Sequence, residues 1–302
     1  MTRVATIPLQ RTLSSAIQRS QQNLATSQIQ LNSGKKAHDY AGLGLDAVRT
    51  LSARSMLEQQ KSYQSVAGRV STTLELYNAH LTQIDNSVGD LRTQLMTALG
   101  TGDSPGIQDL IEHSFGDVRG ALNANEAGMP MFAGSQINDV PFLPKKLSDM
   151  IGLNPADAFT NDKVRPAGRM GDGMDVEYGI VASDVGTTLL PAFRTLAEAG
   201  PFGDKLTDAQ KDAIRVAIDQ IDTGLKDVRA INAENGRKQN QVESLQDRAE
   251  DRTILLTEVI GKVEDADLGQ VAIDISQRKS ILEASYSVFS QLSSLSLARF
   301  LT

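Results

Sequence analysis

The chain has 302 residues and a net charge of −7, and hydrophobic residues make up 40% of it while aromatic residues make up only 4%. Apolar content drawn mainly from Leu, Ile, Val and Ala favours a mainly α fold over a β-sandwich or barrel. The absence of cysteine excludes disulfides, thiolate metal sites and a cysteine nucleophile, and the acidic balance argues against a basic nucleic-acid-binding surface.

The first predicted element is an N-terminal amphipathic helix. Leu13, Ile17, Leu24 and Leu31 recur at helical spacing, and residues 1–38 carry five basic side chains and no acidic one. The apolar face of this helix is thin and lacks aromatic residues. This pattern favours a partner helix over a membrane surface.

A long helix is predicted next, over residues 45–100. Its apolar residues follow one another at steps of three and four for more than four heptads, at Ala67, Val70, Leu74, Tyr77, Leu81, Ile84, Val88, Leu91, Leu95 and Ala98. Such a seam is typical of a coiled coil, and no proline interrupts it. Gly102 and Pro105 end the helix, and a second helix is predicted at 107–122.

Residues 126–206 are predicted to form an inserted outer domain of α+β or β-rich structure. This segment holds seven of the nine prolines and six of the thirteen aromatic residues. Because proline breaks helices, we expect turn-rich structure around a small core of its own. Residues 172–175 (DGMD) are interpreted as a hairpin turn, since the Glu that would complete a calcium loop is missing.

Residues 207–262 are predicted to form a second long helix, which runs back antiparallel to the first. Thr207 and Gln210 have the spacing of a capping box at its start. The apolar seam is interrupted by Asn232, Asn235 and Gln239. Because the first seam is apolar throughout, we expect Asn232 and Asn235 to meet something other than that helix.

The C-terminal residues 263–302 predict a last helix, which pairs antiparallel with the N-terminal one. Two polar residues, Arg278 and Ser285, occupy positions in its seam. A lone pair of narrow-seam helices buries little surface, so it needs further partners, which we expect to be other copies of the chain. The predicted assembly interface consists of Leu13, Ile17, Leu24, Leu31, Leu268, Val271, Ile275, Leu282, Phe289 and Leu292.

The predicted architecture is therefore a long antiparallel helical rod bundle with paired terminal helices and an inserted outer domain. Residues 1–44 and 263–302 form a terminal polymerisation module in this interpretation. Residues 45–125 and 207–262 form the rod, and residues 126–206 form the outer domain.

Signals for catalysis and for ligand binding are weak. His38, His80 and His113 lie far apart in the sequence and have no metal-binding spacing. The glycines at 168–173 do not follow a predicted strand, and no phosphate-binding GxxxxGK[ST] pattern occurs. We therefore expect no enzyme activity, no cofactor, no metal and no binding to nucleic acid or membrane.

No membrane span or secretory signal peptide is predicted. The sequence has no run of 18 apolar residues, and its first residues lack both an apolar core and a small-residue cleavage site. We expect a cytoplasmic protein, or one exported by a route that does not read such a signal.

Two distant stretches resemble the bacterial flagellin superfamily. Residues 31–45 (LNSGKKAHDYAGLGL) are similar to the segment in which that family's N-terminal helix ends and a loop leads into a rod helix. Residues 263–268 (VEDADL) are similar to the motif that begins the family's last helix.

The residues that distinguish members of this family are mixed. The pairing of FAG at 132–134 with PF at 141–142, together with the ending at 284–301, is more similar to the hook–filament junction members. Residues 39–43 (DYAGL) and the VEDAD stretch are more similar to filament flagellin. We favour the junction type.

The resemblance implies a non-enzymatic structural subunit of the bacterial flagellum, which joins hook to filament by self-assembly through its terminal helices. It further implies an extracellular location, reached by flagellar type III export without a cleaved signal peptide. The implied partners are other copies of the chain, flagellin, a hook-side junction protein and an export chaperone on the C-terminal helix. Two alternatives remain: filament flagellin itself, and an adhesive or glycan-binding surface protein that uses the aromatic residues of 126–206.

Overall fold

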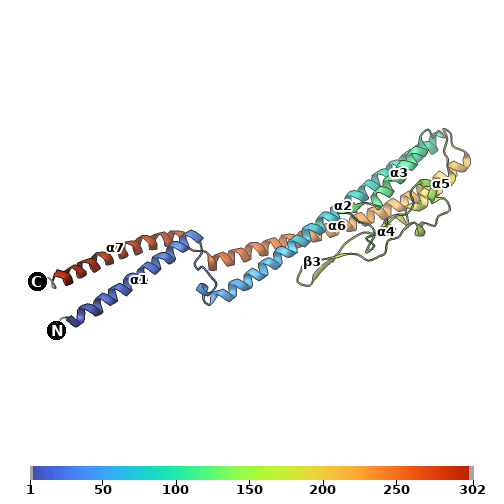
Figure 1. Ribbon diagram of the computed structural model, residues 1–302. Coiled ribbons are helices and arrows are strands. Elements are labelled where there is room, and N and C mark those ends of the chain that lie inside the picture. The colour runs from blue at the N-terminus through green and yellow to red at the C-terminus, as the bar shows by residue number, and fades with distance from the viewer. Residues whose placement is uncertain (1–2, 299–302) are drawn as a thin grey trace. The chain divides into compact units, whose positions relative to one another are not determined.

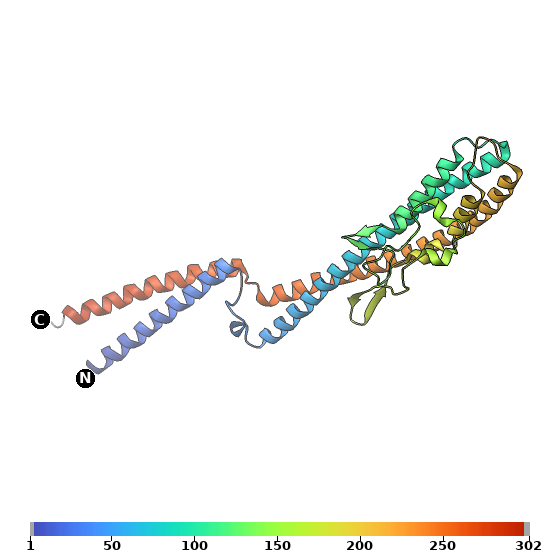
Figure 2. The ribbon, with the colours of Figure 1, turned by 45° about the vertical axis from the view of Figure 1, so that its right-hand side comes forward.

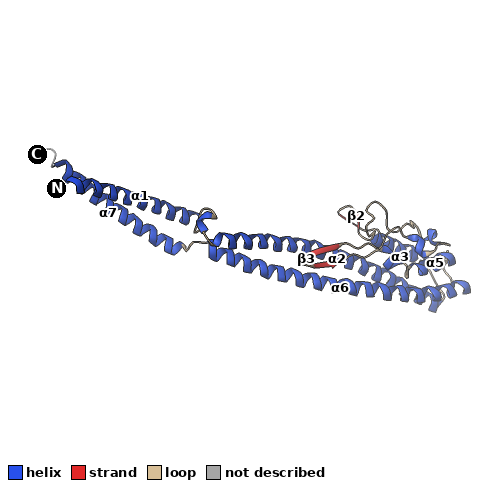
Figure 3. Cartoon of the chain, turned by 90° about the horizontal axis from the view of Figure 1, so that it is seen from below, coloured by secondary structure: helices blue, strands red, loops and turns tan. Residues whose placement is uncertain are grey.

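The computed structural model describes residues 3–298 and confirms the mainly α class (Figures 1 and 3). The helices are α1 (Arg3–Ser33), α2 (Asp46–Thr101), α3 (Ile107–Leu122), α4 (Ala182–Gly186), α5 (Leu190–Ala199), α6 (Asp208–Glu264) and α7 (Leu268–Ala298). The strands are β1 (Asn125–Glu126), β2 (Met129–Pro130), β3 (Ala167–Gly171) and β4 (Met174–Glu177), and 3-10 turns lie at Ala41–Leu43, Leu147–Met150 and Pro155–Ala158.

The chain divides into two compact units, and α2 and α6 contribute to both. Unit 1 comprises residues 1–59 and 252–302, and unit 2 comprises residues 60–251. The predicted division into terminal module, rod and outer domain stays a prediction, because the two units follow compactness alone and cut across the long helices.

The ends of the long helices follow from local chemistry. The last turn of α2 gives way to Gly102, whose positive φ of 78° is the left-handed conformation that commonly ends a helix. At the start of α6, the Thr207 amide donates to Gln210 Oε1 at 3.1 Å, and the Gln210 amide donates to Thr207 Oγ1 at 3.3 Å. The predicted capping box is confirmed.

Within unit 2, α2 and α6 run antiparallel, as predicted. Arg92 of α2 pairs with Asp222 of α6, and the earlier residue Asp85 pairs with the later Arg229 at 2.7 Å. The predicted seam of α2 from Ala67 to Ala98 is buried throughout. From Tyr77 to Ala98 it packs with α3 and α6 into a continuous apolar core, while Ala67, Val70 and Leu74 belong to a second, smaller cluster.

The segment between α3 and α6 does not have a core of its own, contrary to the sequence prediction. Phe132, Phe142 and Phe193 are fully buried in the same core as α2, α3 and α6. The ring of Phe115 on α3 lies 5.9 Å from that of Phe142 and 5.6 Å from that of Phe193. These large side chains bury more apolar surface against α3 than a short, turn-rich segment offers by itself.

Two β-hairpins decorate this segment. β1 pairs antiparallel with β2, and β3 pairs antiparallel with β4 through a bulge between Arg169 and Gly171. The turn that joins β3 to β4 contains Gly173 at a φ of 68°, which confirms the predicted hairpin turn.

The polar interruption of the α6 seam separates two apolar clusters of unit 2. One cluster extends from Tyr77 and Val228 into the large core, and the other gathers around Val70 and Val242. Asn235 lies between them, and its Nδ2 donates to the backbone oxygen of Leu74 at 2.8 Å. The expectation that Asn235 meets something other than the first helix is wrong, because it bonds to that helix's backbone.

In unit 1, α1 and α7 lie side by side (Figures 1 and 2). Arg278 Nη1 donates to the backbone oxygen of Asn23 at 2.6 Å, while Lys35 near the end of α1 bonds to Asp265 just before α7. Rising residue numbers on one helix thus match falling numbers on the other. The predicted antiparallel pairing of the terminal helices is confirmed.

Candidate assembly interface

The predicted interface residues fall into two groups by burial. Ile17 and Val271 are buried between α1 and α7. Four further residues are half-buried along the same seam: Leu13, Leu24, Ile275 and Leu282. These six side chains are the members of the predicted set that the single chain covers at least in part.

The remaining predicted residues are not covered in the single chain. Leu31, Leu268 and Phe289 are exposed, and the side chain of Leu292 lies outside the part of the chain that the structure describes. The seam of the terminal pair is therefore only partly buried by the pair itself.

Polar residues account for this incomplete seam. Ser27 is buried at a seam position of α1, and Arg278 occupies one in α7. A hydroxyl and a guanidinium bury far less apolar surface than a leucine would at the same position. The contact between α1 and α7 therefore adds little stability by itself.

Helix α7 has a second apolar face, which was not predicted from the sequence. Ile273, Ile281 and Val288 follow at steps of eight and seven, which places them on a different side of the helix from Val271 and Leu282. All three are exposed, Ile273 to 62%. A helix that is apolar on two sides belongs in a buried environment, so α7 has room for a partner beyond α1.

A third apolar surface lies at the start of α2 and near the end of α6, also within unit 1. Leu45 is fully exposed and Val48 is 76% exposed, and Ile254 and Leu255 are exposed on α6. A groove of about 550 Å³ lies between these helices, lined in part by Leu45, Val48 and Met56. Exposed apolar surface of this kind marks interaction sites. Apolar residues outside the regular seam were the signal in the sequence for both missed surfaces.

The two stretches that carry the flagellin resemblance meet in unit 1. Lys35 and Asp265 form an antiparallel bridge, in which the Lys36 amide donates to the Glu264 oxygen at 2.7 Å. Asp267 caps α7, since its Oδ1 accepts from the Gly269 amide at 2.9 Å and the Gln270 amide at 3.1 Å. The stretch at 263–268 thus contains the end of α6, the bridge to the N-terminal stretch and the start of α7.

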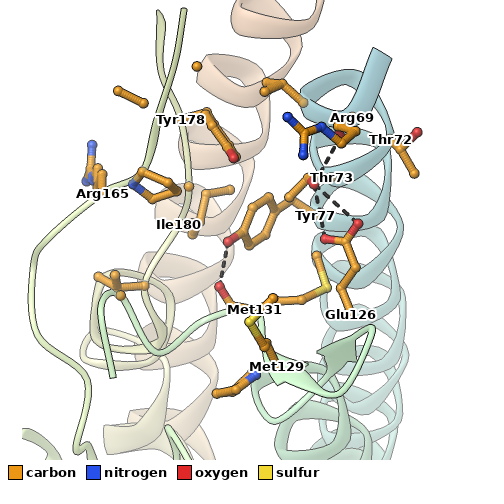
Figure 4. A pocket seen from close by; sticks show the side chains of 18 of the residues that line it. Arg69, Thr72, Thr73, Tyr77, Glu126, Met129, Met131, Arg165, Tyr178 and Ile180 are labelled. Carbon is orange, nitrogen blue, oxygen red and sulfur yellow. Dashed lines mark hydrogen bonds between the residues drawn. The ribbon is translucent and has the colours of Figure 1, made fainter. Parts of the chain in front are cut away.

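A groove of about 700 Å³ lies in unit 2 (Figure 4). Two of its polar groups are already engaged. Thr73 Oγ1 donates to Glu126 Oε2 at 3.0 Å, and the Tyr77 hydroxyl donates to the Met131 oxygen at 2.5 Å. Burial raises the pKa of Tyr77 to about 12, so the phenol keeps this proton. These bonds fasten the β1–β2 hairpin to α2.

The structure brings none of the three histidines together. His38 and His113 are exposed, while His80 lies beside Phe132, where burial lowers its pKa. Within residues 3–298, no three His, Asp or Glu side chains gather as metal ligands. In that same range, no helix combines the length and apolar character needed to cross a bilayer.

The comparisons with known proteins agree with this geometry. Residues 218–301 match the model of the bacterial flagellin C-terminal helical region, which covers most of α6 and all described residues of α7. The flagellar hook-associated protein 3 of Escherichia coli (strain K12) is 26% identical over 259 residues, which cover 81% of this chain and 78% of the relative. The chain is therefore similar to hook-associated protein 3 along most of its length and to the flagellin C-terminal region over residues 218–301.

Solved structures share the fold of this chain. A flagellar hook-associated protein from Vibrio parahaemolyticus has a TM-score of 0.59 at 14% identity, over 72% of this chain and 97% of its own. FlgL from Bacillus cereus has a TM-score of 0.58 at 14% identity, over 70% and 99%. Hook-associated protein 3 from Legionella pneumophila has a TM-score of 0.56 at 10% identity, over 70% and 98%.

Proposed function

We propose that this chain is a structural subunit of the bacterial flagellum, which joins hook to filament by self-assembly through its terminal helices. The proposal rests on α7. This helix matches the flagellin C-terminal region and presents apolar residues on two sides. The α1–α7 pair leaves Phe289, Ile281 and their neighbours exposed. Contacts with other copies would cover them and recover the cost of ordering both helices.

The proposed partners follow from the same surfaces. Other copies of the chain cover the terminal helices, and the relatives' names point to a neighbour on the hook side and flagellin on the filament side. The exposed face of α7 also needs cover before assembly, which fits an export chaperone on this helix. The proposed location is the extracellular part of the flagellum.

No enzymatic role is proposed. The relatives are flagellar structural proteins, and the polar groups of the unit 2 groove hold a hairpin in place. The glycan-binding alternative is not favoured either, because the rings of Phe132, Phe142 and Phe193 are buried and cannot stack on a sugar.

Filament flagellin remains the second candidate. The DYAGL stretch at 39–43 and the VEDAD stretch at 263–267 favour it. Purified protein that polymerises alone after seeding would support the filament role. Protein that assembles only on isolated hook ends would support the junction role.

The assembly surface is tested with Phe289→Asp and Ile281→Asp in the complete chain. A charge on either apolar side of α7 opposes burial against a neighbour, so we expect at least a tenfold loss of incorporation into flagella. Far-UV circular dichroism should change little, because both side chains are exposed in the single chain.

Ser276→Asp is the matched control, since Ser276 is an exposed polar residue of the same helix. It should incorporate normally. Normal incorporation of both apolar variants, or a global loss of helix in either, would contradict the proposed surface.

A further inference from the structure

Glu264 is a buried carboxylate at the point where four helices of unit 1 come together. Its side chain is only 8% exposed, although it is the last residue of α6 and precedes a short linker. A carboxylate is rarely buried without paired charges, because removing it from water is costly.

Two cations from other elements hold this carboxylate. Arg54 of α2 donates in a fork, from Nε to Oε1 at 2.8 Å and from Nη2 to Oε2 at 2.6 Å. Lys35, which follows α1, has its Nζ at 3.4 Å from Oε2, and the same Nζ donates to Asp265 Oδ1 at 2.6 Å. A bidentate guanidinium is directional as well as strong, so it fixes where the carboxylate lies.

Backbone bonds surround the same carboxylate and join the two linkers. The Lys36 amide donates to the Glu264 oxygen, and the Ala266 amide donates to the Gly34 oxygen at 2.8 Å. Lys36 Nζ also donates to the Lys262 oxygen at 2.6 Å, near the end of α6. The ion pairs and the backbone bridge thus act on the same few residues.

We propose that Glu264 is a latch, which keeps the linkers between α1 and α2 and between α6 and α7 ordered in the free subunit. Without its charge, Arg54 and Lys35 no longer share a partner, and the bridge between residues 34–36 and 264–266 opens. The latch concerns the single chain, so it stands or fails separately from the proposed flagellar role.

The same latch is sensitive to acid. Hydrogen bonds from Arg54 lower the pKa of the Glu264 carboxyl, against the opposing effect of burial, and Lys35 lowers it further. The other charged or titratable groups around it are Asp265 in the linker after α6, Lys36 in the linker after α1, and Glu58 and Tyr40 beside Arg54. Because the folded pKa lies below the unfolded value of roughly 4.3, the stabilisation is complete above that value and is lost as pH falls through the folded pKa.

The test is hydrogen–deuterium exchange at the Lys36 and Ala266 amides of the full chain. In Glu264→Gln we expect both amides to exchange at least tenfold faster. Arg54→Lys keeps the positive charge but loses the two-pronged hydrogen bond, so we expect a smaller increase in both exchange rates. The matched control is Glu258→Gln, since Glu258 pairs with Lys262 on the exposed side of the same helix. It should change both rates less than twofold.

Exchange in Glu264→Gln that stays within twofold of the unaltered protein would overturn the latch, as would an equal effect of Glu258→Gln. If Glu264→Gln loses protection throughout unit 2 as well, the same exchange is measured on the unaltered protein from pH 7 to pH 3, and that result decides. Rates are corrected for intrinsic exchange. The latch is supported if both amides lose protection as the pH drops below the ordinary pKa of Glu, while the amides of the α3 core are still protected. Protection that holds, or falls together with the α3 core, overturns it.

Discussion

The turn between β1 and β2 shows how a single residue can be strained. Ala127 has a φ of 50° and Gly128 has a φ of 86°, so both central residues are left-handed. Hairpin turns of this type favour Asn, Asp or Gly, and an alanine adopts such a conformation only at a cost of about 1–2 kcal/mol. The hydrogen bonds that hold the hairpin on α2 keep the alanine in place.

Ala127→Gly is therefore expected to stabilise the protein. Relief of strain is partly offset by the greater freedom of glycine in the unfolded chain, which leaves a gain of about 0.5 kcal/mol in the free energy of unfolding. Gly128→Ala, the converse change at the next position, should lower it by about 1 kcal/mol. Urea denaturation measures both, and a destabilised Ala127→Gly variant would show that the turn is not strained.

The helices show which parts of the structure follow from the sequence. The seams of α2 and α6, the capping box at Thr207 and the antiparallel terminal pair all arise from spacing along one helix. Spacing is visible in a sequence because the helical repeat is fixed. The exposed face with Ile273, Ile281 and Val288 was missed because the seam was traced along one side of α7 only.

The other failures concern contacts between distant residues. The phenylalanines of 126–206 pack against α3, and Asn235 bonds to a backbone oxygen of α2. Neither contact leaves a periodic trace in the sequence, because each depends on which segment the fold brings alongside. A composition shift at 126 therefore indicated a separate core where the structure shares one.

Helix α6 packs closely against Leu189 at Gly224. A Cβ on Gly224 would lie 2.8 Å from the Cα of Leu189, whereas a Cβ on Gly236, in the same helix, would meet nothing within 4 Å. Gly224→Ala should therefore destabilise the protein by about 1–3 kcal/mol, because backbone must move to admit the methyl group. Gly236→Ala should instead stabilise it by about 0.5–1 kcal/mol through helix propensity.

Thermal or urea unfolding of the two variants provides the measurement. Equal effects of the same sign would mean that the Gly224 contact does not constrain α6. A stabilised Gly224→Ala would contradict the close approach of Leu189 directly.

Considered as a whole molecule, the chain distributes its apolar surface unevenly. The aromatic side chains of the proline-rich segment are largely buried in unit 2, and much of the exposed apolar surface lies in unit 1, on α7, at the start of α2 and near the end of α6. Unit 2 has a large apolar core, whereas unit 1 presents exposed apolar surfaces that the proposed assembly would cover. This contrast is what a subunit that assembles through its ends requires.

The most direct test of the proposed role is the position of the protein on the flagellum. Electron microscopy of flagella with an antibody label on this chain should show one band where hook and filament meet. Label along the whole filament would contradict the junction role and support filament flagellin. Flagella that carry no label at all would contradict the flagellar role itself.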